Sequence, residues 1–255
     1  MRYRIGQSQV RLEDDSLLRG TGRFTDDTRQ EGELALVFFR SPVAAGRIVE
    51  LNVAAARAAP GVAAVITGED LHRAGLGCLE PRLRPKAPAG GEMFVPPYYP
   101  LSRDAVRYVG DPLAAVVAET PEQAEDALEL IEFDVEETPA VVDPLAAMAE
   151  GAPAVWQEVP DNRAFLVERG DRAAVEAAFG QASHRVAQRL DISRVTAAPL
   201  EPRNAAATFD AGSEVFTLRL GSQSPQRIAG DLAKVMGTAA EQIRVVAEQT
   251  GGGFG

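Results

Sequence analysis

The sequence predicts an α+β protein in two parts, and three observations support this prediction. A helix with strong capping signals lies among apolar, strand-like segments in the first part. A proline-rich stretch without a regular pattern follows, over residues 134–162. The second part ends in a strand, a loop, a helix and a further strand, over residues 213–248. We place the boundary between the two parts at residues 148 and 149.

Candidate strands lie on both sides of a long loop in the first part. ELALVFFR (33–40) is apolar enough for a buried strand, and residues 58–71 suggest a helix end, a strand and a turn. Residues 76–103 are dense in Pro, Gly and Arg, which predicts a long ordered loop. VRYVGDPLAAVVAE (106–119) then predicts two short strands around a Gly-Asp-Pro turn.

The clearest helix signal is TPEQAEDALELIEF (120–133). Thr120 is suited to be the N-cap, Pro121 the first helical residue and Gln123 the reciprocal partner in a capping box. Ala124, Leu128 and Ile131 then fall on one apolar face.

The second part is expected to contain helices and strands in succession. An Asp N-cap and Gly180 bound a short helix, Asp171 to Phe179. The remaining expected elements are strands at 184–193 and 204–209, a strand at 213–220, a loop at 221–225, a helix at 226–237 stopped by Gly237, and a strand at 241–248.

This order of elements has a geometric consequence for the glycine-rich segment TGGGFG (250–255). If the strands at 213–220 and 241–248 are parallel, the loops that follow them emerge at one edge of the sheet, where ligands of α/β proteins bind. Gln223 would then converge with this segment.

The chemistry of the two converging loops suits an anionic or strongly polar ligand. Consecutive glycines allow close approach of backbone N–H groups, the Gln223 carboxamide donates hydrogen bonds without adding charge, and Phe254 supplies an apolar wall. A lone GGGFG is a weak signal, so a floppy tail and a generic anion-binding α/β domain are the alternatives.

Composition excludes several classes of function. The 37 acidic and 26 basic residues give a net charge of −11, which disfavours binding to nucleic acid or to an anionic membrane surface. With one cysteine, Cys78, and two histidines, the chain has no ligand set for an iron–sulfur cluster or a multi-histidine metal site. The N-terminus has no apolar signal region and no apolar run is long enough to span a membrane, so we expect a cytoplasmic location.

Six segments, taken in order, resemble a known family. Together they are similar to the N-terminal part of the molybdopterin-binding large subunit of molybdenum hydroxylases, the group of xanthine dehydrogenase, aldehyde oxidase and molybdenum carbon monoxide dehydrogenase. The segments are IGQSQVRLEDDSLLRGTGRFTDD at the start, RSPVAAGRI (40–48), VRYVGDPLAAVVAET (106–120), APLEPRNAAATFD (198–210), SQSPQRIAGDLAKVMG (222–237) and GGGFG.

The resemblance implies a fold and a cofactor. Residues 1–148 would form an α/β hammerhead domain, and residues 149–255 the first, incomplete part of a mixed α/β molybdopterin-binding domain. Gln223 matches the family glutamine whose amide hydrogen-bonds an oxo ligand of molybdenum. Phe254 matches the phenylalanine beside the metal, in a loop whose backbone, here Gly251, Gly252, Gly253 and Gly255, lies along the cofactor.

The resemblance also implies an activity and partner subunits. Family members oxidise a small substrate, such as an aldehyde, a purine or other N-heterocycle, or CO, with oxygen drawn from water. Electrons would pass to a 2Fe-2S small subunit and an FAD-binding medium subunit. The cofactor is molybdenum-molybdopterin, and its nucleotide form, with cytosine dinucleotide as one candidate, stays open.

No catalytic residue is expected within the chain, because the family's catalytic glutamate lies in a segment beyond Gly255. Glu201, in LEPR, falls in a structural stretch of the family pattern and is not the expected base. We therefore expect the chain to be part of a longer protein, to be inactive alone and to expose apolar surface. The alternative is a non-catalytic hammerhead module that docks partner subunits.

Overall fold

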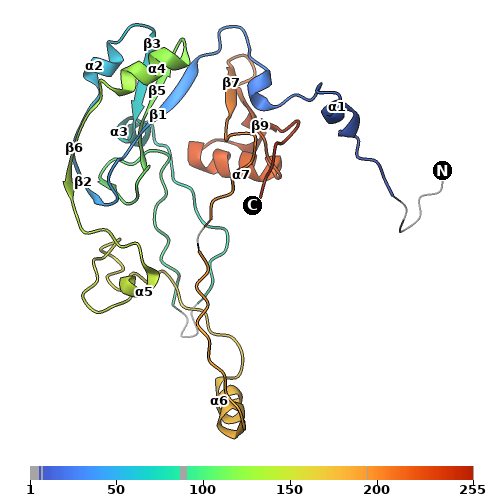
Figure 1. The fold of residues 1–255 in the computed structure, drawn as a ribbon. Coiled ribbons are helices and arrows are strands. Elements are labelled where there is room, and N and C mark those ends of the chain that lie inside the picture. The colour runs from blue at the N-terminus through green and yellow to red at the C-terminus, as the bar shows by residue number, and fades with distance from the viewer. Residues whose placement is uncertain (1–5, 7, 87–90, 194, 255) are drawn as a thin grey trace. The chain divides into compact units, whose positions relative to one another are not determined.

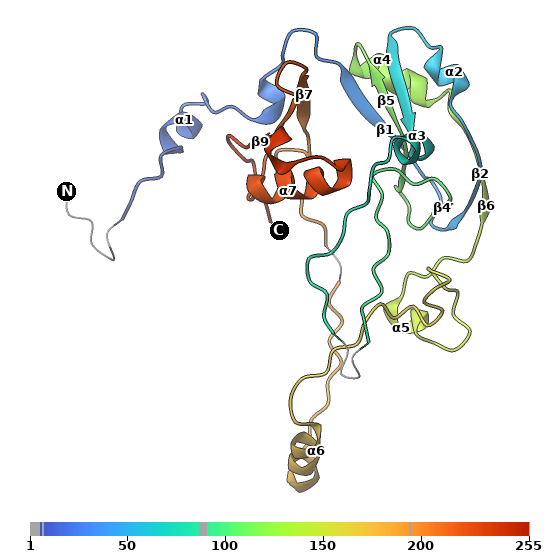
Figure 2. The ribbon, with the colours of Figure 1, turned by 180° about the vertical axis from the view of Figure 1, so that it is seen from behind.

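The structure is a computed structural model that describes residues 6, 8–86, 91–193 and 195–254 (Figures 1 and 2). The chain divides into two compact units. The central unit is Leu34–Arg194, and the terminal unit combines Met1–Glu33 with Val195–Gly255.

The core of the central unit is built on a sheet in the order β1-β5-β3. Strand β5 (Pro112–Ala118) lies in the middle and pairs antiparallel with both β1 (Ala35–Arg40) and β3 (Val62–Thr67). Most of β5 is buried, as its continuous apolar run indicates for a central strand. The buried strand predicted at 33–40 forms as β1, but it lies at the edge of the sheet. Only one of its faces is partly buried, and Leu36 and Phe38 on the other face remain 49% and 43% exposed.

Helix α4 (Pro121–Leu128) packs on this sheet and completes the core. The predicted capping box is present, since Gln123 N donates to Thr120 Oγ1 at 3.2 Å and Thr120 N donates to Gln123 Oε1 at 3.1 Å. The helix is shorter than predicted, and Ile131 reaches the core from the turn that follows it. The core residues are Val53, Ala56, Val65, Ala114, Val116, Ala118, Ala124, Ala127 and Ile131.

A second sheet of the central unit has the order β4-β2-β6. Its strands are β4 (Ala105–Val106), β2 (Gly46–Asn52) and β6 (Glu132–Glu137), and both pairings are antiparallel. Phe39 of β1 meets Phe133 of β6 edge to face, with ring centroids 6.0 Å apart. This contact joins the two sheets.

The proline-rich stretch after β6 is anchored to the central unit by Trp156. The Arg107 guanidinium lies 3.5 Å from the Trp156 ring centroid, and the Phe94 ring lies 5.9 Å from it. Phe94 comes from the long loop predicted at 76–103, whose described residues form only an isolated bridge between Leu79 and Tyr98. Helix α5 (Pro144–Ala147) also lies in the stretch after β6.

An exposed arm, residues 165–193, completes the central unit. It carries helix α6 (Arg172–Gln181), and the segments that lead into and out of α6 run side by side in both views (Figures 1 and 2). Asp171 caps α6 as predicted, but the helix continues through Gly180. The strand predicted at 184–193 is absent from the described residues there, because its alternating apolar side chains have no sheet to cover.

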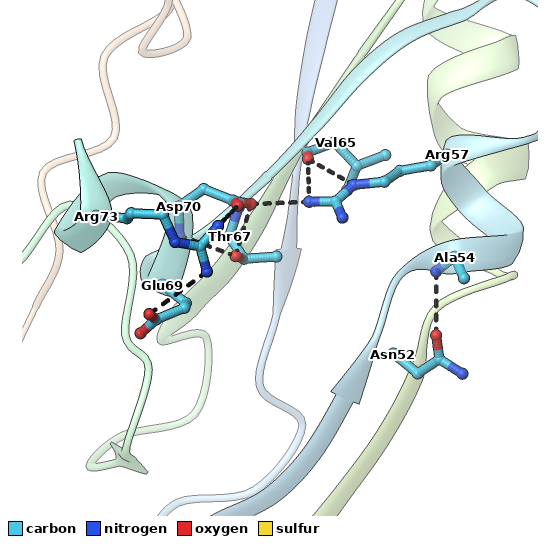
Figure 3. A network of polar contacts seen from close by, with 8 residues as sticks. All are labelled: Asn52, Ala54, Arg57, Val65, Thr67, Glu69, Asp70 and Arg73. Carbon is cyan, nitrogen blue, oxygen red and sulfur yellow. Dashed lines mark hydrogen bonds and ion pairs between the residues drawn. The ribbon is translucent and has the colours of Figure 1, made fainter.

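Arg57 ties helix α2 (Ala54–Arg57) to helix α3 (Gly68–Arg73) in the central unit (Figure 3). Its guanidinium donates to the Val65 carbonyl at 3.1 Å and to Asp70 Oδ2 at 2.8 Å. Asp70 Oδ2 also accepts from the Thr67 N–H and hydroxyl, which closes a capping box at the start of α3. Burial raises the pKa of Asp70, but these hydrogen bonds and the charges of Arg57 and Arg73 outweigh it and lower that pKa overall.

The terminal unit contains a sheet in the order β7-β8-β9. Strand β7 (Ala206–Asp210) pairs antiparallel with β8 (Val215–Arg219), and β8 pairs parallel with β9 (Ile243–Val246). Helix α7 (Pro225–Met236) connects β8 to β9 and ends at Gly237, whose φ of 64° is the left-handed conformation that glycine favours. The unit also includes helix α1 (Asp14–Leu18) and the 3-10 turns η1 (Thr25–Asp27) and η2 (Ala240–Gln242).

We predict that Asp70→Asn lowers the free energy of unfolding by about 1 kcal/mol at pH 7, because it removes a charged acceptor from the cap of α3. The pKa of Asp70 is lower in the folded state, so its stabilisation is present above the unfolded pKa of about 3.9 and is lost as pH falls through the folded value. Urea denaturation at several pH values measures this difference.

The control for this variant is Glu69→Gln. The Glu69 carboxylate is only loosely paired with Arg73 and Arg103, so its loss should change the free energy of unfolding by less than about 0.5 kcal/mol. The assignment would be contradicted if the difference in unfolding free energy between Asp70→Asn and the original chain did not shrink as pH falls below the unfolded pKa of about 3.9.

Candidate functional site

The parallel pairing of β8 and β9 brings two loops to one edge of the terminal sheet. Residues 220–224 follow β8 and residues 247–254 follow β9, and both strands point the same way. Ser222 N donates to Thr250 Oγ1 at 3.2 Å, which joins the two loops directly. The convergence expected from the sequence is therefore present.

A side chain would meet neighbouring atoms at three successive positions of the second loop, which we call the glycine loop (Thr250–Phe254). A Cβ on Gly251 would overlap Glu201 Cβ, and one on Gly253 would overlap the Gln223 carboxamide. A Cβ on Gly252, whose φ is 128°, would lie 2.7 Å from Phe254 Cε2 and 2.9 Å from Pro199 Cβ. The loop is packed against its neighbours through its backbone.

The predicted site residues are brought together with one difference. The Gln223 carboxamide lies against the backbone of Gly253. The ring of Phe254 lies beside Gly252 but remains 72% exposed, so within this chain it borders the site without being enclosed. Gly255 lies outside the described residues.

A cavity of about 330 Å³ opens between these loops and residues 197–204. Its lining includes Gln223, Thr250, Gly252, Gly253, Pro199, Glu201, Arg203 and Asn204. The Nδ2 atom of Asn204 is buried and hydrogen-bonds none of the described residues, so a donor is free beside the cavity. The first turn of α7 also begins next to Gln223, so the positive end of the helix lies at this edge of the sheet.

These groups fit a large polar ligand with negative charge. Backbone N–H groups, a carboxamide, a free amide donor and a helix N-terminus are all donors or positive dipoles. A larger and more open hollow, about 570 Å³, lies at the other end of the same sheet and is bordered by Asp210 and Arg244. None of the predicted site residues lines it.

Sequence patterns missed the contacts that Glu201, Thr250 and Asn204 make at this site. Glu201 Oε2 accepts a hydrogen bond from Gly251 N at 2.6 Å, although the two residues lie 50 positions apart. The only signal available was the position of Glu201 and Asn204 in LEPRN, which marks a motif without saying what it contacts.

Comparisons with known proteins agree on one family. Residues 19–139 match the model of the aldehyde oxidase and xanthine dehydrogenase a/b hammerhead domain, and residues 155–255 match that of the molybdopterin cofactor-binding domain. The chain is 34% identical over 251 residues to the nicotine 6-hydroxylase large subunit of Paenarthrobacter nicotinovorans, covering 98% of the chain and 30% of that relative. The chain belongs to the molybdenum hydroxylase family.

Further relatives support the same conclusion. The carbon monoxide dehydrogenase large chain of Hydrogenophaga pseudoflava is 31% identical, covering 95% of this chain and 30% of its own length. The crystal structure of quinoline 2-oxidoreductase from Pseudomonas putida 86 matches with a TM-score of 0.83 and 32% identity, over 98% of this chain and 31% of that chain. A Cu,Mo-CO dehydrogenase structure matches with a TM-score of 0.82 and 30% identity, over 98% of this chain and 32% of that chain.

The chain spans about 30% of the length of these curated relatives and resembles the N-terminal part of their large subunits. The comparisons confirm the predicted fold class, a hammerhead domain followed by the start of a molybdopterin-binding domain. The matches end at 139 and resume at 155, while the compact units divide the chain elsewhere, so the boundary at 148 and 149 stays a prediction. No helix among the described residues is long and apolar enough to cross a membrane.

We predict that Gly251→Ala destabilises the chain by about 1–3 kcal/mol, because its Cβ would collide with Glu201 Cβ and displace the glycine loop. Gly230→Ala is the matched control, since a Cβ at this position in α7 meets no atom within 4 Å. The control should be neutral or stabilising by up to about 1 kcal/mol. Urea denaturation measures both, and equal effects of the two substitutions would contradict the packing described here.

Proposed function

We propose that the chain is the part of a molybdenum-dependent hydroxylase subunit that forms one wall of the molybdopterin site. The observation that carries the proposal is the convergence of Gln223 with the glycine loop on one polar cavity at the carboxyl ends of parallel strands. When bound, the molybdenum cofactor supplies oxidation of a small substrate with oxygen derived from water. The substrate itself stays open.

In this proposal the residues of the cavity have separate roles. The Gln223 carboxamide and the free Asn204 Nδ2 would both donate hydrogen bonds toward the molybdenum cofactor. The glycine loop would bring its backbone close to the cofactor at Gly252 and Gly253, which line the cavity and carry no side chains of their own, while the Gly251 N–H is held by Glu201. Phe254 would form an apolar wall beside the cofactor, and its exposed ring is available for that contact.

The other groups of the reaction would belong to partner subunits. The chain has one cysteine, so a 2Fe-2S cluster needs a separate small subunit, and FAD would be held by a medium subunit. The catalytic base would come from the portion of the relatives that this chain does not span. A cytoplasmic location and a lack of activity in the chain alone complete the proposal.

We predict that Gln223→Ala combined with Phe254→Ala lowers the molybdenum content of the assembled complex by about tenfold or more, because it removes a donor and a wall beside the metal. Elemental analysis of the purified complex, per mole of this chain, measures the content. Gln226→Ala is the control, since Gln226 is exposed in the first turn of α7 and does not line the cavity. Molybdenum content equal to that of the control would count against both assignments.

A second candidate is a non-catalytic module that docks partner subunits. It is favoured by the central unit, which has a hydrophobic core of its own. A docking module would bind its partner subunits whether or not molybdenum is present. If the original chain forms a complex with partner subunits and that complex contains no molybdenum, the docking module is favoured.

A further inference from the structure

The carboxylate of Glu201 lies between the two loops that form the site. Its Oε2 atom accepts the 2.6 Å hydrogen bond from Gly251 N in the glycine loop. The same atom would lie 2.9 Å from a Cβ on Gly221, in the loop after β8. The half-buried carboxylate therefore touches both loops at the point where they converge.

The N-terminal segment supports this arrangement from within the same unit. Thr25 N points to Glu201 Oε1 at the long distance of 3.5 Å. Gln249 Nε2 donates to Ser16 Oγ at 2.8 Å, and a Cβ on Gly22 would overlap Gln249 Oε1. The beginning of the glycine loop is therefore held at Gln249 by the N-terminal segment and at Gly251 by Glu201.

The position of Gly251 decides where Gly253 lies, because only Gly252 separates them. Gly252 has a φ of 128°, a conformation from which an unrestrained glycine can move easily. Gly253 in turn lies directly against the Gln223 carboxamide. A loop released at Gly251 would therefore leave the amide of Gln223 without the surface that orients it.

We propose that Glu201 is a positioning residue, which fixes the glycine loop at Gly251 and thereby orients the Gln223 carboxamide toward the cofactor. The inference rests on the proposed function of the cavity. Glu201 acts here as a hydrogen-bond acceptor, and its orientation toward Gly251 N is that of a structural carboxylate and not of a base.

Three substitutions of Glu201 distinguish the effect of its hydrogen bond to Gly251 N from the effects of its negative charge and its side-chain volume. Glu201→Gln keeps the length and one acceptor oxygen for Gly251 N, and Glu201→Asp shortens the side chain so that it does not reach. Glu201→Ala removes the acceptor altogether. Glu241→Ala is the control, because Glu241 is an exposed acid of the same unit that borders the other hollow.

Hydrogen–deuterium exchange of the peptide covering residues 249–255, in the assembled complex, measures how firmly the loop is held. We expect exchange to be faster by about tenfold in Glu201→Ala and Glu201→Asp, which corresponds to about 1.4 kcal/mol, one charged hydrogen bond. Glu201→Gln should stay within about threefold of the original chain, and Glu241→Ala should be unchanged. Molybdenum content should follow the same order.

Two results would overturn the inference. One is loop exchange in Glu201→Ala equal to that of the original chain. The other is faster exchange spread equally over β7, β8 and β9, which would show a general loss of stability.

The same measurements distinguish failure of this inference from failure of the proposed function. If loop exchange responds to Glu201 but the Gln223 and Phe254 double substitution leaves molybdenum unchanged, the positioning role holds and the proposed function fails. If the double substitution removes molybdenum but the Glu201 substitutions leave hydrogen exchange of the glycine loop unchanged, the positioning inference alone fails.

Discussion

The parallel pairing of β8 with β9 is the constraint on which the candidate site depends. It directs the loops that follow both strands to one edge of the sheet, and α7 is the connection that makes parallel pairing possible. The first turn of α7 begins at the same edge, so its positive end adds to the donors gathered there. An antiparallel pair would have separated Gln223 from the glycine loop by the length of the strands.

Close packing then converts this topology into a defined cavity. The three glycines leave no room for side chains, so Glu201, Pro199 and Gln223 contact the loop backbone directly. The half-buried carboxylate of Glu201 accepts a hydrogen bond from Gly251 N and so satisfies an N–H group that would otherwise lack a partner in the packed loop. The donors that remain, such as Asn204 Nδ2, are the ones available to a ligand.

Local signals in the sequence predicted much of the fold. The Thr120–Gln123 capping box and the stop at Gly237 depend on residues a few positions apart, and both were found where they were expected. The convergence of Gln223 with the glycine loop followed from the order of strand, helix and strand. The pairing of β2 with β6 joins residues 80 or more positions apart, so no local pattern could indicate it. The contact of Glu201 with Gly251 could not be predicted for the same reason. The prediction of a strand at 184–193, within the exposed arm, was wrong because its alternating apolar residues have no partner strand among the described residues.

The most direct test of this account is the location of molybdenum in a crystal of the assembled complex, found by anomalous scattering at the molybdenum absorption edge. We predict a single peak at the cavity, close enough to the Gln223 carboxamide for this amide to hydrogen-bond an oxygen ligand of the metal. A peak elsewhere, for example in the hollow bordered by Asp210 and Arg244, would contradict it.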